Sequence, residues 1–61
     1  MNIGDKIEHF IKKLGENNII QIEKNKFKIE INEAGRTNEM FLETNKNNEV
    51  MTIEMRSFKS L

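Results

Sequence analysis

Cysteine, proline, tryptophan and tyrosine are all absent from this chain of 61 residues. Without cysteine the chain has no disulfide framework, no thiolate nucleophile and no thiolate zinc site. Its small size is therefore not offset by covalent cross-links, and a domain of about 60 residues buries only about 60% of the surface that its unfolded chain exposes. We expect one marginally stable domain over residues 1–61, with little core left for a deep substrate pocket.

Long apolar runs and a charge excess of either sign are also missing. The longest uninterrupted apolar run has three residues, at positions 40–42, whereas a membrane span needs about 20 and the apolar region of a signal peptide at least about 7. Ten basic and ten acidic side chains give a formal net charge of zero. This balance differs from the basic excess of a nonspecific DNA binder and from the acidic excess of a DNA mimic. We therefore expect a cytoplasmic protein with no membrane contact.

Residues 3–14 have the spacing of an amphipathic helix. The apolar positions that recur every three or four residues are Ile3, Ile7, Phe10, Ile11 and Leu14. On a helix they fall within an arc of about 100°. Asn2 and Asp5 are placed to cap the first turn, and Gly15 is placed to end the helix in a left-handed conformation. The sequence therefore predicts one helix over about residues 3–14.

After the helix the apolar period changes to two, which is typical of strands that bury one face. This alternation predicts strands at about 18–23, 26–32, 39–45 and 49–57. In the first hairpin, a turn at Lys24 and Asn25 would place Ile22 opposite Phe27 and Ile20 opposite Ile29 on the core face.

The second hairpin is expected to turn at Asn47 and Asn48, and residues 32–38 between the hairpins are expected to form the longest loop. This turn predicts the cross-strand pairs Lys46 with Glu49, Leu42 with Ile53, Met40 with Met55, and Glu39 with Arg56.

The predicted architecture is α+β, with one N-terminal helix packed on a four-stranded antiparallel sheet in the order α-β-β-β-β. The order of the two hairpins in the sheet stays open, and an alternative exchanges one hairpin within a dimer. A helix is about 10 Å wide, whereas four strands span about 14 Å between their outer axes. One helix cannot cover that face, so the leftover apolar surface and the free sheet edges predict a homodimer or a module that binds a protein partner.

Catalytic and metal-binding constellations are not apparent in the sequence. His9 falls on the polar side of the helix, and the two serines, Ser57 and Ser60, lie near the chain end. A nucleophile with a neighbouring base and a calcium loop with alternating acidic ligands are both missing. We expect neither an enzyme, a cofactor, a metal site nor a small-molecule substrate.

Exposed apolar residues of the second hairpin are the best functional clue. Phe41, Val50 and Phe58 would share the face opposite the core, while Met51 and Met55 would lie on the core face beside an uncovered strand. Aromatic residues in such patches often anchor interfaces, and methionine adapts to varied contacts. We therefore predict a partner-binding surface here. The alternative is that these residues complete a second small core within the monomer.

Nucleic-acid binding is the other functional hypothesis. Lys24, Lys26 and Lys28 gather on the outer face of the first hairpin, and Phe41 could stack on a base. Glu23 and Glu30 dilute this basic patch. The hypothesis requires an affinity that falls steeply with salt.

The favoured function is a small non-enzymatic protein-protein interaction module. Its size and its richness in asparagine, lysine, isoleucine and glutamate suggest a phage or mobile-element protein that inhibits or modulates a host protein.

Overall fold

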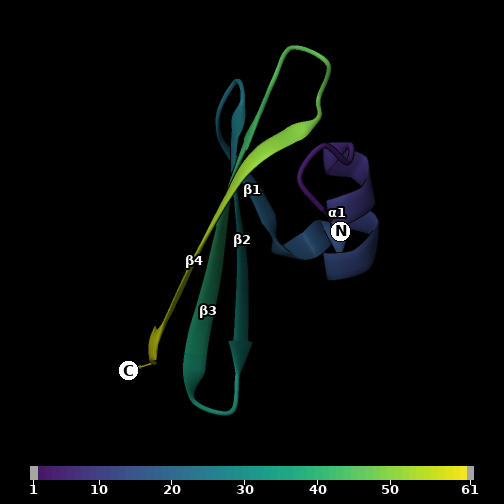
Figure 1. Cartoon of the computed structure of the whole chain (residues 1–61). Coiled ribbons are helices and arrows are strands. Elements are labelled where there is room, and N and C mark those ends of the chain that lie inside the picture. Colours follow the sequence, from purple (N-terminus) through teal and green to yellow (C-terminus); the bar gives the residue numbers. More distant parts are fainter. Residues whose placement is uncertain (1, 61) are drawn as a thin grey trace.

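The chain folds into one helix and one four-stranded antiparallel sheet in this computed structural model, which describes residues 2–60. Met1 and Leu61 lie outside the described residues. The elements are α1 (Ile7–Leu14), a short 3₁₀ helix η1 (Glu16–Asn18), β1 (Ile19–Glu23), β2 (Lys26–Glu33), β3 (Arg36–Thr44) and β4 (Val50–Lys59) (Figure 1). The predicted α+β class with an N-terminal helix is confirmed.

The four strands form a simple meander in the order β1-β2-β3-β4. The expected long loop at residues 32–38 is wrong, because Glu33 of β2 pairs directly with Arg36 of β3. The two residues between them, Ala34 and Gly35, both have positive φ, of 51° and 76°. Positive φ at both central positions is the backbone of a type I′ turn, whose twist matches that of the paired strands. The two predicted hairpins are therefore joined by a third hairpin.

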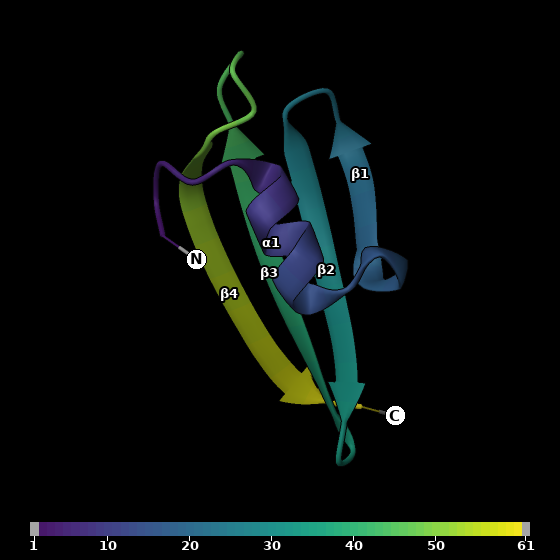
Figure 2. The same ribbon diagram turned by 90° about the vertical axis from the view of Figure 1, so that its right-hand side faces the viewer.

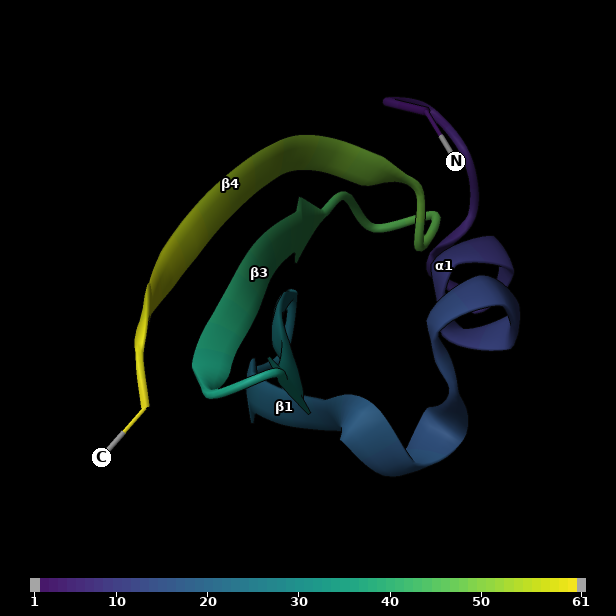
Figure 3. The same cartoon turned by 90° about the horizontal axis from the view of Figure 1, so that it is seen from below.

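Helix α1 covers only one end of the sheet. Figure 2 shows it in front of β2 and β3, with the strands continuing past it, and Figure 3 shows that it closes the open side of a curled sheet. Eight helical residues span about 12 Å, whereas a ten-residue strand spans about 33 Å. The apolar face is thus left uncovered along the length of the strands, and not only across the width of the sheet.

The helix begins at Ile7, so the prediction of a start near residue 3 is wrong. Gly4 has a φ of 97°, and its N–H donates to the carbonyl of Val50 at 2.7 Å. Val50 N–H in turn donates to the carbonyl of Asp5 at 2.8 Å. The segment before the helix is therefore held against the edge of β4. The predicted end is correct, because Gly15 follows the last helical residue with a φ of 93°.

A bulge changes the predicted register of the first hairpin. Glu23 pairs with Lys26 across the predicted turn, but the register then shifts between residues 21 and 23, so that Ile19 and not Ile20 lies opposite Ile29. Ile20 and Ile22, which were predicted on the core face, are therefore exposed at 54% and 52%. Lys24 and Asn25 both lack positive φ. Their turn cannot have the type I′ geometry, whose twist matches that of the strands. The bulge accommodates the difference in twist between this turn and the two strands.

The second hairpin keeps most of its predicted register. Three expected pairs are present: Leu42 with Ile53, Met40 with Met55, and Glu39 with Arg56. The turn is longer than expected, since the strands end at Thr44 and begin again at Val50, and Lys46 does not pair with Glu49. A second register shift lies between residues 43 and 44 and leaves Met51 as the extra residue on β4.

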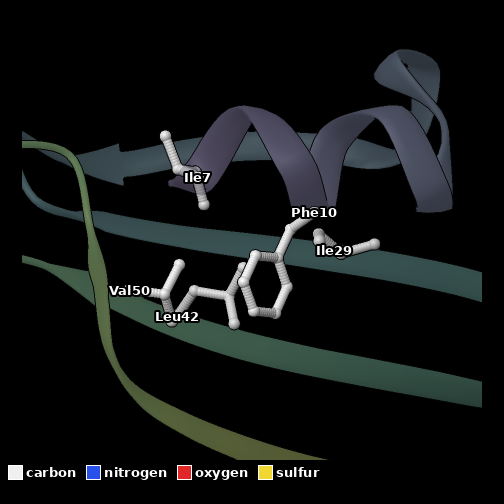
Figure 4. Packing of buried hydrophobic residues seen from close by; sticks show 5 residues of the cluster. All are labelled: Ile7, Phe10, Ile29, Leu42 and Val50. Carbon is white, nitrogen blue, oxygen red and sulfur yellow. The ribbon is translucent and has the colours of Figure 1, made fainter. Parts of the chain in front are cut away.

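The core lies between α1 and the nearer half of the sheet. Its buried members are Ile7, Phe10, Ile29, Leu42 and Val50 (Figure 4). The ring of Phe10 projects from the helix toward Ile29 and Leu42, and Val50 packs beside Leu42. Seven partly buried side chains surround this cluster: Ile11, Leu14, Ile19, Phe27, Ile31, Met40 and Ile53.

Candidate functional site

An ion-pair cluster centred on Glu39 occupies the outer face of the sheet, away from α1. Glu39 is only 6% exposed, although it is charged. Its carboxylate accepts a hydrogen bond from Nε of Arg56 at 2.8 Å and also contacts the terminal guanidinium nitrogen of Arg56. Nζ of Lys28 approaches the other carboxylate oxygen at 3.2 Å. The buried charge is thus compensated from both neighbouring strands, as burial of a carboxylate requires.

These contacts shift the pKa values of both partners in the expected directions. The hydrogen bond from Arg56 lowers the pKa of Glu39, with a further contribution from Lys28, and burial opposes both. The hydrogen bond to Glu39 raises the pKa of Lys28, and Glu30 at 3.4 Å adds to this effect. The cluster is therefore held in its charged form.

Arg56 also lies between two aromatic rings. Its guanidinium carbon is 5.7 Å from the ring centroid of Phe41 and 5.4 Å from that of Phe58. Both distances fit a cation–π contact. The Arg56 side chain remains 63% exposed. We call Phe41, Arg56 and Phe58 the aromatic face.

The structure separates the predicted partner-binding residues. Phe41 and Phe58 lie near each other, as expected, and the structure adds that Arg56 contacts both rings. Val50 does not join them: it is fully buried, so its prediction as an exposed patch residue is wrong. The bulge beside it reverses the side-chain direction, which turns Val50 into the core and exposes Met51 at 49%. Met55 stays on the inner face and is 76% exposed.

A shallow apolar groove of about 390 Å³ lies on the inner face, where the helix ends. Its apolar walls come from Leu14 of α1, Ile29 and Ile31 of β2, Met40 of β3 and Met55 of β4. The groove is the part of the predicted uncovered face that lies nearest to the helix. Together with the aromatic face, it gives β4 apolar side chains on both sides.

The lysines of the nucleic-acid hypothesis are mostly engaged with carboxylates. Lys28 contacts Glu30 and Glu39, and Lys26 lies 3.7 Å from Glu23. Lys24 lies in the turn between β1 and β2, where its carbonyl accepts a hydrogen bond from the side chain of Gln21. These pairs neutralise the basic patch that the sequence predicted.

No catalytic arrangement emerges around the remaining candidates within residues 2–60. His9 is exposed on α1. The hydroxyl of Ser57 accepts from Arg36 at 3.3 Å, and that of Ser60 lies 2.7 Å from the hydroxyl of Thr37. In this described part of the chain, three or more His, Asp or Glu side chains nowhere gather to hold a metal ion. Nor does any helix there have the length and apolarity to cross a membrane.

The burial of Glu39 is the feature that sequence reasoning missed. The hairpin register correctly placed Glu39 opposite Arg56, but the second cation comes from β2, which the sequence could not place beside β3. The signal that could have found it is the charge pattern. The two predicted hairpins can lie side by side in several orders. Only the order β1-β2-β3-β4 places β2 beside β3 and so brings Lys28 within reach of Glu39.

Comparison with known proteins gives no relative, because no family model, no curated protein and no solved structure matches this chain.

Proposed function

We propose that this chain is a small non-enzymatic protein-binding module. The observation that supports this most directly is the aromatic face, where Arg56 is held between Phe41 and Phe58 on a sheet surface opposite the helix. Aromatic residues, phenylalanine among them, and arginine are enriched at protein interfaces relative to the rest of the surface, and arginine is also frequent among the residues that dominate binding energy. The aromatic face has this composition and lies on regular strands.

The ion pair with Glu39 prepares Arg56 for such a role. A free arginine side chain loses rotamer entropy when an interface immobilises it, at a cost of about 0.5–1.5 kcal/mol. The buried Glu39 carboxylate already fixes the guanidinium within the single chain. A partner that packs on Phe41 and Phe58 therefore meets a preorganised surface.

The charge of this surface favours a protein partner over a nucleic acid. The formal charges of the four residues of this cluster sum to zero, because Lys28 and Arg56 balance Glu30 and Glu39. Phosphate backbones are bound by surplus cations that displace counterions. Nucleic-acid binding remains the alternative hypothesis, and it requires a steep loss of affinity with salt.

A module of this kind acts by occupying a surface of its target, as an inhibitor or modulator. A phage or mobile-element origin, with a host protein as the target, is part of this proposal and is supported by chain size and residue usage alone.

Two matched substitutions test the proposal. Phe58→Ser removes an aromatic ring that is 41% exposed on β4, while Ile22→Ser makes a comparable apolar-to-polar change at a site 52% exposed on β1. The wild-type chain is immobilised, a partner is captured from an extract of the source cells and identified, and its affinity is then measured with purified proteins by calorimetry. We expect Phe58→Ser to weaken binding by about tenfold or more and Ile22→Ser to leave it unchanged.

Equal losses in the two variants, or no loss with Phe58→Ser, would contradict the aromatic face as the binding surface. The same purified chain is titrated with single-stranded and duplex oligonucleotides between low and physiological salt. Binding that falls steeply over this range would favour the nucleic-acid alternative instead.

A further inference from the structure

The outer edge of β4 has unpaired backbone groups along its C-terminal half. Ser60 N–H donates to the carbonyl of Gly35 at 2.8 Å, and the pairing with β3 is regular from there back to Thr52. Hydrogen-bonded and non-hydrogen-bonded pairs alternate along an antiparallel ladder. It follows that Glu54, Arg56 and Phe58 bond to β3. The remaining alternate residues point their N–H and C=O groups away from the sheet: Ile53, Met55, Ser57 and Lys59.

The other edges of the sheet are protected. At the start of β4, the segment around Gly4 and Asp5 bonds to both backbone groups of Val50. On the opposite side of the sheet, β1 has only five residues and contains a bulge, and both features discourage pairing with another chain. The free half of β4 is therefore the site where strand addition is open.

We propose that a second copy of this chain pairs with β4 in antiparallel fashion, about a two-fold axis that passes beside Met55. This register places Met55 opposite Met55 of the second copy. It also places Ile53 opposite Ser57 of the second copy and, by symmetry, Ser57 opposite Ile53 of the second copy. All three residues are among those whose backbone groups point outward. The pairing joins two four-stranded sheets into one continuous sheet of eight strands.

Charge complementarity selects this register over its neighbours. With the axis at Met55, Glu54 of each copy lies opposite Arg56 of the other, in the closer, non-hydrogen-bonded type of pair. An axis at Glu54 would oppose two carboxylates, and an axis at Arg56 would oppose two guanidinium groups. Within residues 2–60, Glu54 makes no ion pair with its own chain. The dimer supplies the partner that the monomer lacks.

The side chains on the inner face fit the same axis. Met55 is the most exposed large apolar residue described, at 76%, and its flexible thioether adapts to a copy of itself. Each copy then extends the apolar groove of the other toward the axis. Phe41 lies on the opposite face of the sheet and stays open to solvent. Arg56 is shared between this pairing and the aromatic face, whereas the ring of Phe41 takes no part in the dimer, so dimer formation and target binding are tested by different variants.

Solution mass and amide exchange test the dimer and its register together. Light scattering after size exclusion is expected to give the mass of two chains, with dissociation on dilution. Hydrogen exchange followed by NMR above the dissociation constant should show protected amides at Ile53, Met55 and Ser57, while Lys59 exchanges freely. Protection of Lys59 as well would place the axis at Arg56, and a dimer without protection at Ile53, Met55 and Ser57 would overturn edge pairing.

Two proline variants separate pairing from folding. Met55→Pro removes an outward N–H at the axis, so it deletes the two central intermolecular bonds and no bond to β3. Lys59→Pro makes the same change at an outward position beyond the paired segment. We expect Met55→Pro to raise the dissociation constant about 100-fold or more and Lys59→Pro to leave it within about twofold, with circular dichroism showing both folded.

A charge variant tests the register without touching the backbone. Glu54→Lys places a cation opposite Arg56 of the second copy, and we expect the dissociation constant to rise about tenfold at low salt and less at high salt. Glu43→Lys is the matched control, because Glu43 is an exposed carboxylate on β3, away from the edge. A monomer at millimolar concentration, or a dimer equally tolerant of Glu54→Lys and Glu43→Lys, would overturn the proposal.

Discussion

The carboxylate of Glu39 on β3 and the guanidinium of Arg56 on β4 lie opposite each other in the strand ladder, with Nε donating at 2.8 Å. Lys28 of β2 reaches the same carboxylate from the other side at 3.2 Å. One buried acidic side chain thus links three strands on the face that the helix does not cover. The inner face is joined by apolar packing, whereas this outer face is joined by charge.

The first prediction concerns pH. Because contacts with Arg56 and Lys28 lower the pKa of Glu39 below its usual 4.5, its ionised form stabilises the fold at pH values above 4.5. That contribution is lost as the pH falls through the lowered pKa, when the native carboxylate takes up a proton. We expect the urea concentration at the unfolding midpoint to decrease as the pH is lowered through this acidic range. The variant Glu39→Gln should be less stable than wild type at pH 7, and the difference should shrink as the pH falls through the lowered pKa of Glu39.

Glu8→Gln provides the control for this titration, because Glu8 is an exposed carboxylate on α1. The Glu8→Gln variant should lose stability on acidification as wild type does, whereas Glu39→Gln should not show this loss. At the alkaline end, the raised pKa of Lys28 means that its contribution is intact below its usual 10.5 and disappears as the pH rises through the raised value. An acid profile that Glu39→Gln leaves unchanged would show that the cluster does not stabilise the fold.

The second prediction tests the bulge in β4. Val50→Ala removes two buried methyl groups beside Leu42 and should lower the free energy of unfolding by about 2 kcal/mol. Met51→Ala removes a larger side chain that is 49% exposed, and should change it by at most about 0.5 kcal/mol. Urea denaturation of both variants measures the difference. A larger loss for Met51→Ala would mean that β4 pairs without the bulge and that Met51 faces the core.

The strands and the helix could be predicted from period alone, because a change from 3.6 to 2 in apolar spacing distinguishes the two. The register of the second hairpin could also be predicted, since it alone opposes Glu39 to Arg56 and Met40 to Met55. Charge and apolar alternation agreed there, and the structure confirms the pairs. The overall α+β class follows from these two signals.

The faces of Val50 and Ile20 could not be predicted, because each lies on the far side of a bulge from the pairs that set the register. One extra residue reverses every side chain beyond it. The helix start was missed for a related reason. Gly4 bonds to the edge of β4, and such a tertiary contact leaves no trace in the local period.

The third prediction concerns the turn between β2 and β3. Ala34 has a φ of 51°, which strains any residue with a Cβ, and asparagine tolerates this conformation best. Ala34→Asn should therefore raise the free energy of unfolding by about 0.5–1 kcal/mol. Gly35→Ala should lower it by about 1 kcal/mol through backbone strain alone, because a Cβ at Gly35 meets no atom within 4 Å. Thermal unfolding of the two variants shows whether each change raises or lowers the free energy of unfolding. A lower stability of Ala34→Asn would contradict the turn geometry.

The last prediction concerns the loop between β3 and β4, which Asn45 organises. Its side-chain oxygen accepts hydrogen bonds from the backbone of Asn47 at 2.8 Å and of Glu49 at 3.0 Å, and its amide donates to the Glu49 carboxylate at 2.9 Å. The adjacent carbonyl of Asn48 accepts from the N–H of Ile7, so this loop also fixes the start of α1. Asn45→Ala should destabilise the fold by about 1–2 kcal/mol.

The matched control for this loop is Asn47→Ala. Asn47 is exposed in the same loop, and its contacts are made by its backbone N–H and carbonyl. Because alanine keeps both groups, we expect Asn47→Ala to change the free energy of unfolding by at most about 0.5 kcal/mol. Amide exchange adds a second readout: Asn45→Ala should speed exchange at Ile7, since its acceptor, the Asn48 carbonyl, lies in the loosened loop. Equal stability of the two variants would show that the loop holds its shape without the Asn45 side chain, and that the hydrogen bond at the helix start depends on core packing instead.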